Sequence, residues 1–289
     1  MSAPTVRRRR LGSKLRALRG DLTLEEVADL SKGRFVYSKL SRIETARSAP
    51  KEADIAALLD LYAQHGRDVS EELRSALLML AKEGPQRGWW HSYRGVLSPT
   101  FEDLISLEAE AESVSTWQIG VIPGFFQTPE YAREIIKATG MAEAVEENVE
   151  ALVEVRLARQ AVITRPQPLN VWAIVSELAL QVGSARPGLM RDQLSRLLDA
   201  MDRPNVNVQV MPNTGHMHVG LVGSFSMLSF GAHTDLDVVH TEGLTSALYI
   251  EDADKIAAHR HAWQRISSAA LSVESSADLI AKIRNDHDH

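Results

Sequence analysis

Between Leu22 and Arg47 the chain carries the signals of two short helices separated by a tight turn. Thr23 and Glu26 have the spacing of a capping box, in which a hydroxyl and a carboxylate satisfy free amide hydrogens at a helix start. Gly33 suits the left-handed backbone of a sharp turn. Apolar residues at helical spacing supply each helix with a buried side, namely Val27, Ala28 and Leu30 before the turn and Val36, Leu40 and Ile43 after it. The segment therefore predicts a helix-turn-helix.

Helical spacing continues on both sides of this segment. Leu11, Leu15 and Leu18 predict a helix before it, and residues 55–62 and 68–83 predict two helices after it. Residues 84–88 contain Gly and Pro, which disfavour a continued helix and indicate a domain boundary. We therefore expect a basic arm at 1–10, an all-α helix-turn-helix domain at 11–84 and a second domain at 85–289.

The second domain mixes helical stretches with short β-rich runs. Strand-like segments are expected at 169–175, 206–211, 224–230, 237–241 and 247–250. Helices are expected near 101–118, 129–139, 143–164, 187–201, 252–271 and 275–286. Because the strands cluster together, we expect an α+β fold overall, with a small, mostly antiparallel sheet in the second domain and helices packed on it.

Basic and acidic residues are unevenly distributed along the chain. The 289 residues have a net charge of −6, whereas the first 50 hold 12 Lys or Arg against 5 Asp or Glu, a charge of +7. The rest of the chain therefore carries −13. A basic head on an acidic body predicts that the head contacts a polyanion, while the body limits non-specific binding to nucleic acid.

Composition argues against several other classes of protein. The hydrophobic share of 44% is enough for a packed core, yet no run of about 18 apolar residues predicts a membrane-spanning helix. The basic start is not followed by the apolar stretch of a secretory signal. The chain has no cysteine, which excludes disulfides, thiol catalysis and cysteine-ligated zinc. We expect a cytoplasmic protein that does not contact a membrane.

The outward side of the helix after the turn is the candidate DNA contact, because an exposed helix can enter a major groove about 12 Å wide. Arg42 suits the acceptors of guanine, and the nearby hydroxyls suit base edges or phosphates. Lys39, Arg47 and the amide-rich start of the helix at Thr23 suit phosphates. The arginine run at 7–10 suits the DNA backbone or the minor groove. The predicted DNA-binding residues are Thr23, Tyr37, Ser38, Lys39, Ser41, Arg42, Arg47, Arg7, Arg8, Arg9 and Arg10.

Each of these assignments has a structural alternative. Arg42 can instead form a surface salt bridge, and Tyr37 can cap the local core. The arginine run at 7–10 can be a solvated tail. Glu44 is expected to be structural and to orient a neighbouring basic side chain.

Two sets of motifs resemble known families. Residues 38–44 (SKLSRIE), preceded by 22–28 (LTLEEVA), resemble the helix-turn-helix of XRE-type, phage-repressor-like regulators. Residues 121–132, 203–212 and 242–252 resemble the large C-terminal domain of unknown function found in many actinobacterial regulators. The resemblance implies transcriptional regulation, sometimes described as antitoxin-like, with a small partner protein encoded nearby. The spacing from Ala28 to Leu40 is two residues longer than the usual pattern, which implies an enlarged turn or a shifted helix.

Apparent chemical sites in the second domain have simpler interpretations. His216 and His218 have the spacing of two ligands on a strand, with Glu242 or His240 as a possible third, but the glycines around them favour a loop over a metal site. No nucleophile, base and orienting group stand at a recognisable spacing, so neither an enzyme nor a cofactor is expected. The five tryptophans can line a small-molecule pocket, although core packing is the more common role: Trp89, Trp90, Trp117, Trp172 and Trp263.

Three functional hypotheses follow. The leading one is a homodimeric, sequence-specific regulator of double-stranded DNA, whose second domain dimerises and senses a small-molecule effector or a partner protein. The second is an antitoxin-like module that silences a small partner and binds DNA for autoregulation. The third is an enzyme with a regulatory head, acting through the region of His216, His218 and Glu242, which stoichiometric zinc or iron in the purified protein would support.

Overall fold

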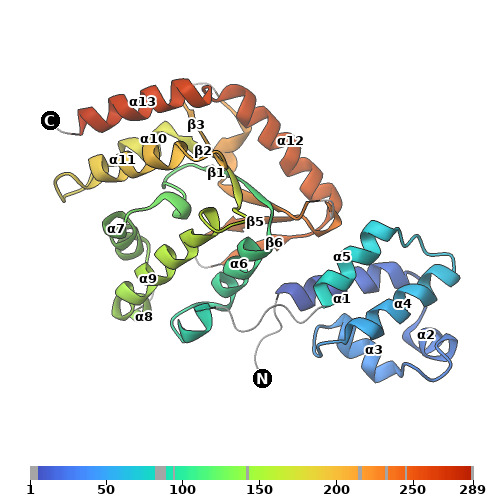
Figure 1. Ribbon diagram of the computed structural model, residues 1–289. Helices are drawn as coiled ribbons and strands as arrows, with labels where there is room; N and C mark the ends of the chain where they lie inside the picture. Colours follow the sequence, from blue (N-terminus) through green and yellow to red (C-terminus); the bar gives the residue numbers. More distant parts are fainter. Residues whose placement is uncertain are drawn as a thin grey trace. The chain divides into compact units, whose positions relative to one another are not determined.

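The computed structural model describes residues 6–81, 89–93, 95–140, 143–213, 217–231, 234–244 and 246–287 (Figure 1). The chain forms two compact units. The first runs to Gly88 and also includes Ala232–Leu236, and the second comprises Trp89–Gly231 and Asp237–His289.

The N-terminal part of the first unit is helical, as predicted. Its helices are α1 (Val6–Arg19), α2 (Leu24–Leu30), α3 (Tyr37–Glu44), α4 (Glu52–Gln64) and α5 (Glu71–Ala81). Each contributes apolar side chains to one core, which includes Leu11, Leu15, Val27, Leu40, Ile43, Ile55, Leu58, Leu59, Tyr62 and Leu77.

The connection between α2 and α3 spans six residues. Thr23 and Glu26 form the predicted capping box, so α2 begins where the sequence placed it. The chain then reverses at Lys32 and Gly33, whose φ angles are 51° and 85°. Gly33 has the left-handed conformation that was expected of it.

This turn changes which apolar residues are buried. Leu30 and Val36 were expected in the core, but both are exposed. Phe35 occupies the core instead, and the Ser31 hydroxyl accepts a hydrogen bond of 3.0 Å from its amide. The reason is geometric, because the left-handed residues of the turn rotate the following backbone so that Phe35, not Val36, faces inward.

The predicted arm at 1–10 is replaced, from Val6 onwards, by the first turns of α1, and residues 1–5 lie outside the described ranges. Val6 and Arg10 are buried. The Arg7 guanidinium donates hydrogen bonds to the backbone carbonyls of Met79 and Leu80 in the last turn of α5. Within the described residues these carbonyls accept no hydrogen bond from their own helix, and a cation beside the C-terminal end of a helix is stabilising.

Gly12 allows α1 to pack closely against the end of α3. A Cβ atom at this position would lie 2.6 Å from the Glu44 carbonyl oxygen and 2.7 Å from the Ile43 carbonyl oxygen. Both distances are too short for any side chain, so the crossing of these two helices requires glycine.

The second unit is built on a six-stranded mixed sheet with the order β3-β2-β1-β4-β5-β6. The strands are β1 (Ser113–Gln118), β2 (Asn170–Ser176), β3 (Val206–Met211), β4 (Phe225–Ser229), β5 (Val238–Glu242) and β6 (Ala247–Ile250). β1 pairs in parallel with β2, and β2 with β3, whereas the β1-β4, β4-β5 and β5-β6 pairs are antiparallel. The α+β prediction is confirmed, with parallel strands in one half of the sheet.

Strand β1 corrects the prediction of one helix over 101–118. Helix α6 (Pro99–Glu110) ends at Ala111, whose backbone is extended, and β1 then lies between β2 and β4. The segment alternates and contains β-branched and aromatic residues, with Val114 and Trp117 buried. Such residues are favoured on a pleated surface that neighbouring strands supply.

The remaining helices surround this sheet (Figure 1). The predicted helix at 143–164 is divided into α8 (Glu143–Glu147), α9 (Val149–Arg159) and the short 3-10 segment η3 (Gln160–Ile163). The other helices are α7 (Pro129–Thr139), α10 (Glu177–Gln181), α11 (Leu189–Met201), α12 (Ala253–Ala269) and α13 (Val273–Asp286). Further 3-10 segments of the second unit are η1 (Trp89–Tyr93), η2 (Gly124–Phe126) and η4 (Val219–Val222), whereas η5 (Thr234–Leu236) belongs to the first unit.

One core cluster of the second unit joins the sheet to α12. It combines Trp117, Ile174 and Val239 from three strands with Ile256 and Ile266 from α12. No helix among the described residues has the length and apolar character required to cross a membrane.

Candidate functional site

Helix α3 has one buried and one exposed side, as a DNA-reading helix requires. Leu40 and Ile43 anchor it in the core. On its other side Ser38 and Arg42 are exposed, Tyr37 is 50% exposed and Ser41 is half-buried. Four of the predicted contact residues therefore share one accessible helix face.

An ion pair fixes the end of α3. The Arg19 guanidinium binds both carboxylate oxygens of Glu44, with Nε–Oε1 and Nη2–Oε2 distances of 2.7 and 3.0 Å. The hydrogen bond to Glu44 raises the pKa of Arg19, while burial opposes the effect. The prediction that Glu44 orients a basic neighbour is confirmed, and the partner is on α1.

Two predicted contacts are engaged within the first unit. The Lys39 ammonium lies 2.9 Å from an Asp54 carboxylate oxygen and 5.0 Å from the centre of the Phe35 ring. The Thr23 hydroxyl accepts a hydrogen bond of 3.1 Å from the Glu26 amide and contacts the Glu26 carboxylate. Both side chains therefore have a structural role, which the sequence predicted for Thr23 as a helix cap but not for Lys39.

The arginine run divides between the inside and the outside of the unit. Arg10 is only 2% exposed, and the Arg7 guanidinium is held at the end of α5, so neither side chain is directed at an external partner. Arg8 and Arg9 are exposed on α1. Because consecutive helical residues point in different directions, Arg8 and Arg9 face outward while Arg7 and Arg10 do not. Only two of the four predicted arginines are therefore accessible for phosphate contacts.

The segment after α3 places a second arginine near its C-terminal end. Ala46 has a φ of 58°, and the Arg47 amide donates a hydrogen bond of 2.7 Å to the Arg42 carbonyl. This closes the helix and leaves both the Arg42 and the Arg47 side chains exposed.

Val36 is a candidate contact that the sequence prediction missed. It precedes α3, is 57% exposed and adjoins the exposed Tyr37. An exposed aliphatic side chain at the start of a reading helix suits the methyl group of thymine. The sequence shows three apolar residues in a row at 35–37, but only the turn geometry decides which of them is buried.

The histidine residues of the second unit have separate surroundings. The His218 ring lies edge-on to Trp117, 5.6 Å away, whereas the His240 ring lies 5.0 Å from Tyr249. His216 lies outside the described residues. Within the described ranges, no three His, Asp or Glu side chains are grouped as metal ligands.

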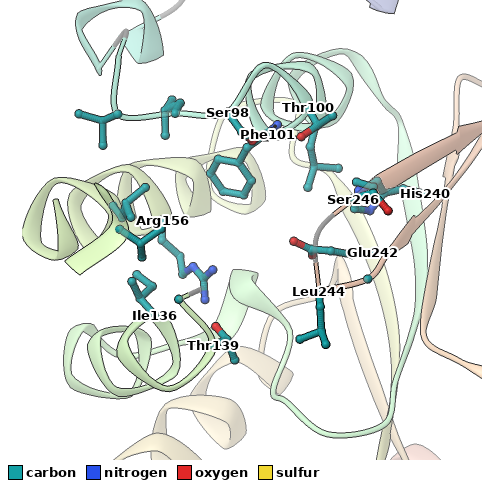
Figure 2. Close-up of a pocket in the computed structure, with 18 residues that line it drawn as sticks. Ser98, Thr100, Phe101, Ile136, Thr139, Arg156, His240, Glu242, Leu244 and Ser246 are labelled. Atoms are coloured by element: carbon teal, nitrogen blue, oxygen red, sulfur yellow. Dashed lines mark hydrogen bonds between the residues drawn. The ribbon is translucent and has the colours of Figure 1, made fainter. Parts of the chain in front are cut away.

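The second unit contains a pocket of about 550 Å³ that no tryptophan lines (Figure 2). Trp117 is buried, and its indole nitrogen donates a hydrogen bond of 2.9 Å to the Gly220 carbonyl. Trp90 and Trp263 pack against core clusters, and Trp172 bonds to Gln209. Trp90, Trp117 and Trp263 therefore have the core role, and other residues form the wall of the pocket.

Comparison with known proteins agrees with this division of the chain. A family model described as Helix-turn-helix domain matches residues 10–73, which include α2 and α3. A second model, described as Domain of unknown function (DUF5753), matches residues 101–282, more than half of the chain. No curated protein and no solved structure matches the chain. The chain therefore belongs to the DUF5753 family and carries an N-terminal helix-turn-helix domain, which indicates a DNA-binding regulator.

Proposed function

We propose that this protein is a cytoplasmic, sequence-specific transcriptional regulator of the XRE type, of the kind found in actinobacteria. One observation carries the proposal, namely the exposed face of α3 on a basic head. Leu40 and Ile43 hold the helix in the core while Ser38, Ser41 and Arg42 are left accessible. The proposal assigns no enzymatic activity to the chain.

The exposed groups suggest how a DNA duplex is read. Arg42 donates to the O6 and N7 atoms of a guanine, and the hydroxyls of Ser38 and Ser41 bond base edges or phosphates. Val36 and Tyr37 contact thymine methyl groups. Arg47, Arg8 and Arg9 neutralise phosphates, which position the head without reading sequence.

We infer that two copies of the chain bind together, because helix-turn-helix heads usually recognise two half-sites one DNA turn apart. A groove of about 520 Å³ in the second unit supports this inference, and its walls come from η4, β6 and α12. Val222 at its edge is 92% exposed, and Leu248 on the edge strand β6 is 61% exposed. Exposed apolar side chains around a groove are typical of protein contacts.

An antitoxin-like role is the second candidate, because the same groove suits a small partner protein. Light scattering of the purified chain separates the two candidates when it is combined with a Leu248→Asp variant. A dimer that the variant converts to monomers supports the first. A chain that is monomeric by itself, and that co-purifies with the product of a neighbouring gene only when Leu248 is intact, supports the second.

Selection of bound fragments from sheared genomic DNA tests the proposed function directly. We expect the purified full chain to enrich fragments that share a two-fold-symmetric motif. Recovery of unselected DNA, or of none at low salt, would contradict sequence-specific regulation.

A further inference from the structure

The pocket in the second unit has mainly apolar walls and opens between helices and the end of the sheet (Figure 2). Phe101 of α6, Ile136 of α7 and Leu152 of α9 form much of its apolar surface. Residues from the β5–β6 connection form the opposite side. A volume of about 550 Å³ lies within the range of pockets that hold small organic ligands.

Arg156 brings a positive charge into this apolar space. Figure 2 shows its guanidinium group pointing into the pocket from α9. Nη1 donates a hydrogen bond of 2.9 Å to the Gln127 side-chain oxygen. In the described part of the chain, Arg156 has no carboxylate within ion-pair distance, and it is the only Lys or Arg in the pocket wall.

Two nearby arginines differ from Arg156 in that each binds a carboxylate. Arg159, one turn later on α9, binds both oxygens of Glu108 and lies over two aromatic rings. Arg133 on α7 binds both oxygens of Glu150. Arg156 alone among these three faces a cavity with a neutral amide as its partner.

Electrostatics agree with an uncompensated cation. Burial, followed by the positive charge of Arg159, lowers the pKa of Arg156 to about 10, although Glu242 and Tyr131 act in the opposite direction. His240 is also in the wall, and burial lowers its pKa to about 4, so it is neutral near pH 7. Desolvating a charge is unfavourable unless a partner compensates it, and a ligand anion is such a partner.

Glu242 supplies a second polar group across the pocket. Its carboxylate points inward from the end of β5, on the side opposite Arg156 (Figure 2). The two side chains are close enough to influence each other electrostatically, but they are not within the 4.0 Å of an ion pair. A ligand that accepts from Arg156 and donates to Glu242 satisfies both groups.

We propose that this pocket binds a small amphipathic organic acid that also carries an ammonium or hydroxyl group. Its carboxylate binds the guanidinium of Arg156, its donor group binds Glu242, and its apolar body contacts Phe101, Ile136 and Leu152. Binding itself is independent of DNA, and only the role of this acid as the effector rests on the proposed function.

Calorimetry on the full chain tests this proposal with four probes of the same carbon skeleton, namely octanoate, octan-1-ol, 2-aminooctanoate and 8-aminooctanoate. We expect octanoate to bind and octan-1-ol to bind at least tenfold more weakly, because the alcohol has no anion for Arg156. One of the two amino acids is expected to bind more tightly than octanoate, and which one it is reports the spacing of the two charged groups.

Substitutions then assign the contacts. Arg156→Gln is expected to weaken octanoate binding about 30-fold. Arg156→Lys is expected to weaken it by a smaller factor, because lysine keeps the charge but not the bidentate geometry. Glu242→Gln is expected to remove the advantage of the amino acid over octanoate. Arg133→Gln, which removes an exposed ion pair outside the pocket wall, is the matched control and leaves all affinities unchanged.

Several results would overturn the proposal. They are equal binding of octanoate and octan-1-ol, no binding by any acid at about 10 mM, or unchanged octanoate affinity in a folded Arg156→Gln protein. No preference for either amino acid would overturn the role of Glu242. DNA binding measured on the same samples keeps the two proposals separate, since loss of the probe site leaves operator recognition intact in the absence of ligand.

Discussion

The Arg19 guanidinium on α1 and the Glu44 carboxylate at the end of α3 form a two-point ion pair with little solvent exposure. It connects the C-terminal ends of two helices through residues that are 25 positions apart in the sequence. This pair holds the end of α3, the helix that carries the candidate reading face. We therefore expect loss of Glu44 to affect both the stability of the head and the orientation of that face.

Glu44→Gln is expected to lower the free energy of unfolding of the head by about 2 kcal/mol, because it leaves Arg19 without its counter-charge in a largely buried position. All five tryptophans lie beyond residue 88, so tryptophan fluorescence follows the second unit while far-UV circular dichroism follows both. Urea unfolding should show an earlier dichroism transition with unchanged fluorescence. The exposed Glu25→Gln serves as control, and equal behaviour of the two variants would show that the pair is not stabilising.

Gly12→Ala is expected to destabilise the head by about 1–3 kcal/mol, although alanine usually stabilises a helix relative to glycine. The added Cβ would meet the Ile43 and Glu44 carbonyl oxygens and force α1 away from α3. Ser13→Ala, at the next and exposed position of α1, is the matched control. A Gly12→Ala protein as stable as the wild type would argue against the close crossing.

Arg42→Ala is expected to weaken binding to the selected operator by about 1–3 kcal/mol and to relax the preference at one base pair. Arg47→Ala should instead weaken binding to all sequences by a similar factor, because phosphate contacts carry no sequence information. Quantitative gel shifts on the operator and on single-base variants measure both effects. If Arg42→Ala binds the operator with wild-type affinity, Arg42 is not a reading residue.

The double variant Arg8→Gln, Arg9→Gln is expected to reduce the slope of log affinity against log salt by about 2, since each phosphate contact contributes about 0.9 to it. It is a better test than deletion of the first ten residues, because the deletion would remove the first turns of α1 together with the buried Val6 and Arg10. An unchanged slope would show that neither exposed arginine contacts DNA, with Arg133→Gln as the control for lost charge elsewhere.

Acid should destabilise the second unit through His240. Burial lowers its folded pKa to about 4, below the unfolded value of 6.5, so the unfolded chain binds more protons between these values. Stability is therefore complete above about pH 6.5 and decreases by up to about 3 kcal/mol as the pH falls to 4. Unfolding followed by tryptophan fluorescence should show a smaller loss of stability with falling pH for His240→Phe than for the wild type. The same pH dependence in the two proteins would exclude His240 as the cause.

Local chemistry explains which predictions held. The capping box at Thr23, the left-handed Gly33 and the buried Leu40 and Ile43 depend on residues within a few positions of each other. The same holds for the five later strands, whose β-rich character is a property of short segments. Strand β1 was missed because a segment after a helix becomes a central strand only when partners more than 50 residues away pair with it.

The sequence by itself determined a basic helical head with a helix-turn-helix, an α+β second domain and the residues that anchor α3 in the core. Only the tertiary structure decided that Phe35 and not Val36 is buried, that Arg7 and Arg10 turn inward, and that Arg156 faces a pocket. The physical reason is the distance along the chain over which each interaction acts. Caps and helix periods are short-range interactions, whereas the burial of a side chain and the pairing of a charge depend on groups that the fold brings together from distant parts of the chain.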